Sequence, residues 1–161
     1  MTDARTRPYV ILWFSMGRLT GVVLAVIAFG SVASAQPAAI GKAKIVSGKV
    51  VVVRGAAKTP VKVGDTLNEH DVFETGADGS LGVTFTDNTS FSIGPNSHVA
   101  IDTYFFDPKN LKGNMMAQLK KGTMMVRSGE LTRQQPGSVQ IKTPRTVLGV
   151  RGTTFVVSVD P

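Results

Sequence analysis

Short alternations of apolar and polar residues, separated by turn-forming residues, dominate this chain. The clearest examples lie within residues 63–101, where residues 81–86 and 91–93 alternate in this way. Turns built from Asp, Asn, Gly, Pro, Ser and Thr follow them at residues 87–90 and 94–97. Runs of period two that contain β-branched and aromatic residues, punctuated by such turns, are typical of consecutive short β-strands. The pattern therefore predicts an all-β fold.

The segments on both sides of this stretch continue the pattern. Residues 44–54 predict two strands around a glycine turn, and their four consecutive valines favour burial on both faces of the second strand. Residues 139–141 predict a further strand, and residues 147–159 predict two strands around Gly152. After residue 40 no segment has apolar residues at helical spacing over several turns, so we expect little helix.

Three segments are predicted to be loops or turns. Residues 104–113 interrupt the alternation and indicate a longer surface loop, whose three adjacent aromatic residues form either a core plug or an exposed contact, burial being the commoner fate. Residues 120–122 predict a hairpin-like turn between strands at residues 115–119 and 123–126. Residues 130–138 predict a polar loop.

The number and shortness of these strands favour one compact domain, either sandwich-like or an irregular solenoid. A length of 161 residues fits a single domain, and 17 glycines and 8 prolines supply many turns. The chain has no strict repeat of fixed period, so a regular β-helix of identical rungs is not expected.

An apolar run near the N-terminus has the features of a signal peptide. Residues 19–29 are apolar, follow Arg18 and precede the small-residue motif Ala33-Ser34-Ala35. A basic residue, an apolar run and an A-x-A motif in this order predict export. We expect cleavage between Ala35 and Gln36. The expected organisation has three segments: a signal peptide over residues 1–35, a linker over residues 36–43 and a β-domain over residues 44–161.

Two alternatives concern this N-terminal segment. Translation from Met16 would give a compact signal peptide of 20 residues. An uncleaved membrane anchor is the other alternative, because residues 8–32 are long enough to span a bilayer. We favour cleavage, since Arg18 would lie at mid-span, where a charge is costly. Both alternatives place the folded part outside the cytoplasm.

The composition excludes some chemistry and shows an uneven distribution of charge. The chain has no cysteine, so it has no disulfide framework and no thiol nucleophile. Residues 65–107 contain eight Asp and Glu and no Lys or Arg, whereas residues 109–151 contain nine Lys and Arg and only one Glu. Either strands of opposite sign pair across the sheet, each exposed pair contributing about 0.2 to 1 kcal/mol, or a basic surface meets a polyanion or an acidic protein.

The two histidines are the candidates for acid–base catalysis. His70 has Glu69 and Asp71 as neighbours, and His98 follows Ser97. Adjacent residues on a strand point to opposite faces, so these neighbours are not expected to converge on one reacting centre. The chain also lacks the G-x-S-x-G and H-E-x-x-H motifs. We therefore predict that the protein is not an enzyme.

Metal, cofactor and nucleic-acid sites are not expected either. Asp78-Gly79 and Asp87-Asn88 resemble calcium loops only in their residue types, and the further ligands of an EF-hand are missing. Turn formation explains these residues. Residues 149–152 (G-V-R-G) lack the Lys-Ser/Thr of a phosphate loop. DNA recognition by a helix is not expected of an exported β-protein.

Three motifs follow one another along the chain. They are the series of turns in residues 63–97, the sequence L-K-K-G-T-M-M-V-R at residues 119–127, and the sequence I-K-T-P-R-T-V-L-G-V-R-G-T-T-F-V-V at residues 141–157. Together they resemble the periplasmic domain of the FecR family, over roughly residues 45–159. Members of that family commonly have Asp-Gly-Ser where this chain has Asp87-Asn88-Thr89-Ser90. Because Asn tolerates positive φ, we expect a similar turn.

The resemblance implies an all-β periplasmic domain that relays a signal. In the iron-uptake regulators that it resembles, this domain contacts the signalling domain of an outer-membrane receptor, and a cytoplasmic N-terminal segment controls a sigma factor. Fewer than twenty residues precede Leu19, which is too few for such a segment. Pro161 directly follows a predicted strand, so we expect either a partner that caps the fold or a longer chain.

The sequence therefore predicts a non-enzymatic, exported FecR-like domain that acts as a periplasmic binding, sensing or scaffold module. Its expected partner is a protein of the cell envelope, with an outer-membrane receptor signalling domain as one candidate, or an envelope glycan. Contact with a membrane is expected only if the N-terminal segment stays uncleaved. A membrane-anchored regulator of cell-surface signalling and a glycan-binding protein are the alternative functions.

Overall fold

The computed structural model describes residues 38–151 and 154–160. The described residues belong to one compact unit, Ala35–Pro161. The predicted signal peptide and its cleavage position between Ala35 and Gln36 lie outside the described residues. Within the described residues, no helix has the length and apolar character needed to cross a membrane.

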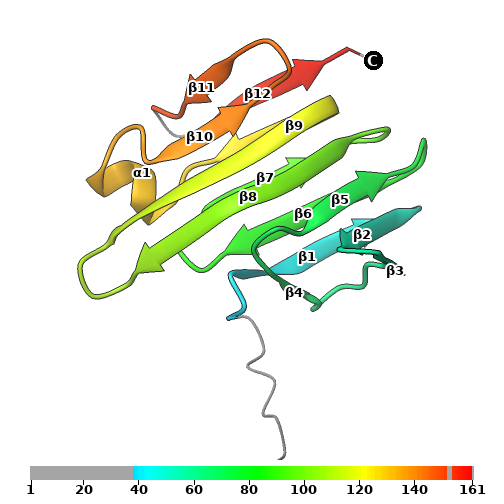
Figure 1. Cartoon of the computed structure of the whole chain (residues 1–161), viewed down its shortest axis with the longest axis horizontal. Coiled ribbons are helices and arrows are strands. Elements are labelled where there is room, and N and C mark those ends of the chain that lie inside the picture. The colour runs from blue at the N-terminus through cyan, green and yellow to red at the C-terminus, as the bar shows by residue number, and fades with distance from the viewer. Residues whose placement is uncertain (1–37, 152–153, 161) are drawn as a thin grey trace, which may run out of the picture. The chain divides into compact units, whose positions relative to one another are not determined.

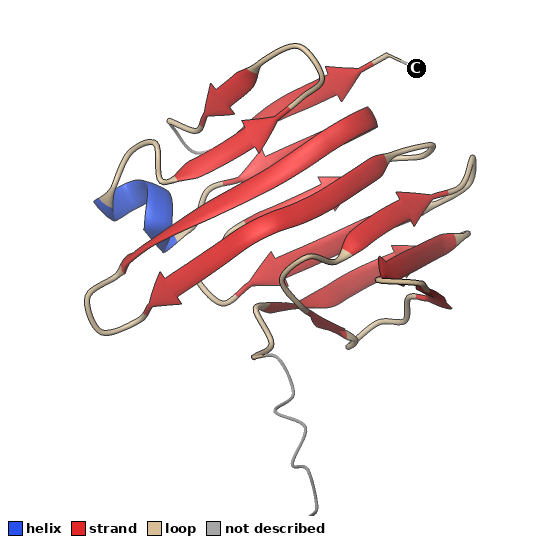
Figure 2. Cartoon of the chain, viewed as in Figure 1, coloured by secondary structure: helices blue, strands red, loops and turns tan. Residues whose placement is uncertain are grey.

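The described part of the chain is almost entirely β, as the sequence predicts (Figure 2). Strands account for 59% of it and helix for 4%. The elements in chain order are β1 (Gly41–Ser47), β2 (Val50–Arg54), β3 (Ala57–Pro60), β4 (Thr66–Leu67), β5 (Val72–Thr75), β6 (Ser80–Phe85), β7 (Ser90–Ile93), β8 (His98–Asp107), β9 (Lys112–Arg127), α1 (Glu130–Gln134), β10 (Val139–Lys142), β11 (Val147–Gly149) and β12 (Thr154–Val159).

These strands form one curled sheet, a half-barrel with the order β3-β2-β5-β8-β9-β7-β6-β1-β4. β10 and β12 also pair with β9, and β11 pairs with β10. The two ends of this order, β3-β2 and β1-β4, are both drawn at the bottom of Figure 1, and β10 to β12 at the top. Neighbouring strands are antiparallel except β9 and β10, which are parallel.

The long strand β9 pairs with different strands along its two parts. Its first part pairs with β8 and β10, and its last part, from Gly122 onward, pairs with β7 and β12. The change occurs at Gly122, whose φ of +88° is open to glycine but strained for other residues. A Cβ atom at this position would lie 2.1 Å from the Ser97 hydroxyl oxygen. The curl therefore depends on a residue without a side chain at Gly122.

The core fills the concave side of the sheet with alternate residues of each strand. Its aromatic centre consists of Phe85, which lies edge-on to Phe91 at 4.9 Å and stacks with Tyr104 at 5.3 Å between ring centroids. In β2 only Val50 and Val52 are buried, so the expected burial of both faces is wrong. The reason is that β2 belongs to an antiparallel sheet with one face toward solvent.

The structure corrects two predictions around β9. Residues 104–113 are not a long loop, because β8 continues to Asp107, β9 begins at Lys112 and only a short turn separates them. Their aromatic residues alternate: Tyr104 is buried, Phe105 is 60% exposed and Phe106 is partly buried. The turn predicted at residues 120–122 is also wrong, since these residues continue β9 as one strand.

Two further segments differ from expectation, and one turn agrees with it. Residues 130–138 contain the short helix α1, whose Leu131 is fully buried, instead of an entirely polar loop. β1 begins at Gly41, inside the segment 36–43 predicted as a linker. Asn88 has a φ of 65°, which confirms the positive-φ turn expected between β6 and β7.

The bend of β9 can be tested by comparing two glycines with the same backbone conformation. Gly137 also has a φ of +88°, but nothing lies within 4 Å of a Cβ built there. We expect Gly137→Ala to lower the free energy of unfolding by about 1 kcal/mol through backbone strain alone. Gly122→Ala should cost about 1 to 3 kcal/mol more, because the new methyl group overlaps Ser97. Urea unfolding of both variants measures the difference, and equal losses would show that the contact with Ser97 does not constrain the bend.

Candidate functional site

The histidines singled out in the sequence do not form catalytic groups with their neighbours. Asp71 accepts two hydrogen bonds from the Arg54 guanidinium, at 2.6 and 2.9 Å. Glu69 accepts a hydrogen bond from the backbone N–H of Tyr104 at 3.0 Å. His70 occupies an exposed turn with a φ of 67°. The carboxylates of its two acidic neighbours therefore bond to Arg54 and Tyr104 and not to His70.

The Ser97 and His98 side chains likewise contact different residues and not each other. The Ser97 hydroxyl accepts a hydrogen bond from the Thr123 backbone N–H at 3.0 Å and donates to the Pro95 carbonyl at 3.1 Å. His98 Nδ1 lies 4.0 Å from a Glu74 carboxylate oxygen, and no group in the described part of the chain bonds to its buried Nε2. These contacts fix the backbone beside Gly122 and do not activate the hydroxyl.

Two acidic residues of the central segment, Asp71 and Glu74, pair with cations that precede them in the chain. Arg54 binds Asp71, and this hydrogen bond is the largest of the effects that raise the pKa of Arg54. Lys58 lies 2.5 Å from Glu74 and lowers the pKa of that carboxyl group. The predicted pairing of strands of opposite sign is observed between β8 of the acidic segment and β9 of the basic segment, where Asp107 lies opposite Lys112. No salt bridge joins the two segments among the described residues, and Arg133 alone of residues 109–151 forms one, with Glu130.

The edge strands of the sheet differ in how well they are protected from pairing with another chain. β3 carries Lys58 and ends in Pro60, and β4 is only two residues long, all features that discourage pairing. β12 has six residues, T-F-V-V-S-V, with no charge and no proline. It pairs with β9 alone among the described strands, and its Val156 is 62% exposed. β11 also pairs with only one described strand, but it is three residues long, so β12 is the edge least protected against an additional strand.

A pocket of about 550 Å³ lies beside this edge, between the end of β12 and the turn that joins β10 to β11. Its apolar lining comes from Leu148, Val157 and Val159. Lys120 and Arg145 supply positive charge at the same pocket. The turn is held by Thr143, whose N–H donates to the Thr146 carbonyl at 2.8 Å. The term "β12 edge site" denotes β12, this pocket and the neighbouring Lys121.

The positive charge at the β12 edge site also acts on His98. Lys120, Lys121 and His98 line an adjoining depression together with Asp160. Burial lowers the pKa of His98, Lys120 and Lys121 lower it further, and Glu74 partly opposes them. Asp160 is the one carboxylate among the described residues that line the pocket and the depression. The site can thus accept an apolar strand that carries negative charge.

Sequence reasoning did not find this site. It identified the basic segment, but Lys120 and Lys121 were assigned to a turn, and residues 147–159 were interpreted only as strands. That β12 has a free edge depends on pairing between distant strands, which no local pattern reveals. Within the described residues, no group of three or more His, Asp or Glu side chains could hold a metal ion.

A family model described as "FecR protein" matches residues 71–161. This match covers more than half of the chain. The chain belongs to the FecR family. No curated protein and no solved structure matches it. The matched segment extends from just before β5 through β12 and so includes all residues of the β12 edge site.

FecR membership supports a signalling-related regulator domain. The family is one of non-enzymatic signalling regulators and takes part in signalling with envelope proteins. The exposed edge of β12 and the cations beside it are features that suit contact with another protein. The β12 edge site is accordingly the part of this FecR domain to consider first as a protein-binding surface.

The pKa of His98 gives a test of the electrostatics around the β12 edge site. Because its pKa is lower in the folded protein than the ordinary value of about 6.5, proton binding favours the unfolded chain. The free energy of unfolding should therefore fall as the pH drops from about 7 to about 5, and this loss should level off below the folded-state pKa. His98→Gln should reduce the slope in that window, measured by urea unfolding at each pH. Glu74 has a lowered pKa and stays charged there, so an unchanged slope in His98→Gln would contradict the assignment.

Proposed function

We propose that this protein is an exported FecR-family sensing or scaffold module that works in the periplasm by binding another protein. The observation that carries the proposal is the six-residue uncharged edge of β12, with Val156 exposed on it. Proteins normally protect such an edge with charge, proline or a short strand. An edge left open in this way suits an extended partner segment that adds to the sheet.

The charge around the edge indicates the chemistry of the partner. Lys120, Lys121 and Arg145 form no salt bridge with the described residues. Like charges at this density repel a basic partner and attract an acidic one. The partner we propose therefore presents an extended segment with apolar side chains for the pocket and acidic side chains for the lysines. A strand edge recognises main-chain groups, which favours a protein over a glycan.

Export rests on the sequence at the N-terminus. The A-x-A motif at Ala33 to Ala35 supports cleavage before Gln36, and the mature chain would then act as a separate periplasmic protein. Among envelope proteins, the signalling domain of an outer-membrane receptor is the candidate partner that the family suggests. The absence of an assembled acid–base pair around His70 and His98 in the described structure supports binding as the mode of action.

Site-specific photo-cross-linking in cells of the source organism tests this function. A benzophenone side chain replaces Val156, and in a matched control it replaces Val63, an equally exposed valine in a turn away from β12 (62% and 64%). We expect position 156 to give an adduct with another envelope protein and position 63 to give none. Lys120→Gln with Lys121→Gln should weaken the adduct several-fold at physiological salt. The adduct-bearing chain should begin at Gln36.

Three results would contradict parts of the proposal. Equal labelling from positions 156 and 63, or none from position 156, would exclude the β12 edge as the binding surface. An adduct of twice the chain mass would show that a second copy of this chain occupies the edge. An intact N-terminus in the membrane fraction would replace the periplasmic module with a membrane-anchored regulator.

A further inference from the structure

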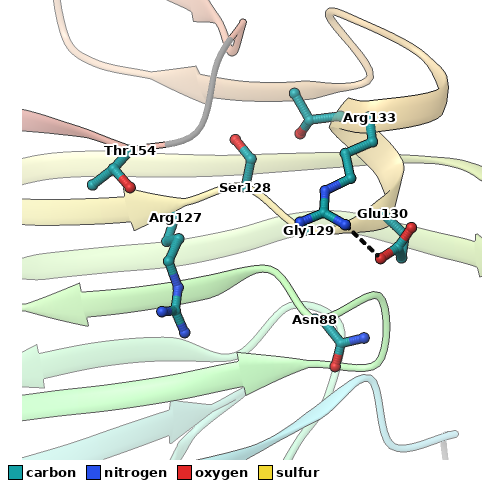
Figure 3. Close-up of a pocket in the computed structure, with 8 residues that line it drawn as sticks. Asn88, Arg127, Ser128, Gly129, Glu130, Arg133 and Thr154 are labelled. Atoms are coloured by element: carbon teal, nitrogen blue, oxygen red, sulfur yellow. Dashed lines mark hydrogen bonds and ion pairs between the residues drawn. The ribbon is translucent and has the colours of Figure 1, made fainter.

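A second pocket, of about 470 Å³, lies between the β6–β7 turn, the end of β9 and α1. Most of its lining side chains are polar, and two of them are arginines, Arg127 and Arg133 (Figure 3). The Arg127 guanidinium has no hydrogen bond or ion pair with any described residue. Arg133 lies 3.4 Å from Glu130, the one carboxylate in the described lining. The pocket therefore keeps one unbalanced positive charge.

Thr132 gives the pocket a buried hydroxyl group without a partner. The residue is 6% exposed, and its Oγ1 makes no hydrogen bond within the described structure. Other buried hydroxyls near α1 are satisfied: Ser138 donates to the Leu131 carbonyl at 3.0 Å, for example. An unsatisfied buried hydroxyl lowers stability, so its presence beside two arginines points to a ligand that would bond to it.

The walls of this pocket are held in place by a buried polar network. The Glu130 N–H donates to the Asp87 carbonyl at 2.8 Å, and the Gly129 N–H donates to Thr89 Oγ1 at 3.1 Å. The Asp87 carboxyl group in turn accepts from the Thr89 hydroxyl at 2.5 Å and the Tyr104 hydroxyl at 3.1 Å. Burial raises the pKa of Tyr104, which keeps its hydroxyl protonated as a donor.

This network ties the β6–β7 turn to the start of α1. Asn88 stands at the tip of the turn, between two residues of the network, with the positive φ that the turn requires. Figure 3 shows Arg127 extending from β9 on one side of the pocket and the Arg133–Glu130 pair on α1 on the other. Buried contacts thus hold the turn that carries Asn88 and the start of α1 in place around the pocket.

We propose that this pocket binds an oxyanion, a phosphate or carboxylate group, through the Arg127 guanidinium, the Thr132 hydroxyl and the Asn88 amide. A guanidinium presents paired N–H donors that match two oxygens of such a group. The hydroxyl and the amide supply further donors. This inference is independent of the β12 edge site, whose pocket is lined by other residues.

Sequence reasoning gave no sign of this site. Thr132 falls in a segment predicted to be a polar loop, where a threonine is common and does not indicate a site. Arg127 is one of nine basic residues in its segment, and nothing in the sequence distinguishes it from the others. The signal is the missing hydrogen-bond partner of Thr132, which only the packing of α1 against β9 reveals.

Backbone amide NMR of the purified protein, titrated with sodium phosphate and separately with sodium acetate, tests the proposal. Chloride keeps the ionic strength equal and low in all samples. We expect saturable shifts of the amides of Arg127 and Thr132. Arg127→Gln and Thr132→Val should each weaken binding by about tenfold or more. Lys62→Gln, at an exposed lysine outside both pockets, should leave it unchanged.

Thermal unfolding separates a binding role of Thr132 from a structural one. Thr132→Val keeps the shape of the side chain and removes the unsatisfied hydroxyl, so its melting temperature should rise while the affinity for the anion falls. Saturation by phosphate alone assigns a phosphate group, and saturation by both anions extends the assignment to carboxylates. Equal affinities in all the variants, or no saturable shift with either anion, would overturn the proposal.

Discussion

The bend of β9 at Gly122 is the constraint on which the rest of the structure depends. It allows one strand to pair with β8 and β10 along its first part and with β7 and β12 along its last part. The sheet can then curl around a single core, which a straight strand of 16 residues would not permit. Because β10 and β12 pair with different parts of the same strand, a pocket lies beside them and β12 keeps a free edge.

The two sites of this FecR domain use different physical resources. The β12 edge site offers unpaired main-chain groups, an apolar pocket and lysines without salt bridges, which together suit a protein segment. The second pocket offers polar side chains as donors, and the buried network around Asp87 and Tyr104 holds the turn at one of its walls. Both lie in the part of the chain that matches the family. Two of the acidic residues, Asp71 and Glu74, pair instead with Arg54 and Lys58 of β2 and β3. Residues 109–151, which contribute to both sites, therefore keep an excess of positive charge.

The sequence predicted the all-β class, the family and the turn at Asn88, because alternation and turn residues are local properties. It failed where a local pattern has two interpretations. Lys120-Lys121-Gly122 has the composition of a hairpin turn, yet pairing with β8, β7 and β12 continues the strand through it. Likewise, aromatic residues 104–106 indicated a loop because their alternation is visible only once Tyr104 is placed against Phe85. Free edges and unsatisfied hydroxyls depend on packing between distant segments and could not be predicted.

Amide hydrogen exchange along β12 tests most directly whether this strand has one free edge. Residues of an antiparallel strand direct their N–H groups alternately to the two sides. In the isolated protein, alternate amides of Thr154–Val159 should therefore be protected by β9, while those between them exchange at rates close to those of exposed loops. Uniform slow exchange along the strand would show that β12 is already covered on both sides, which would contradict its role as the binding edge.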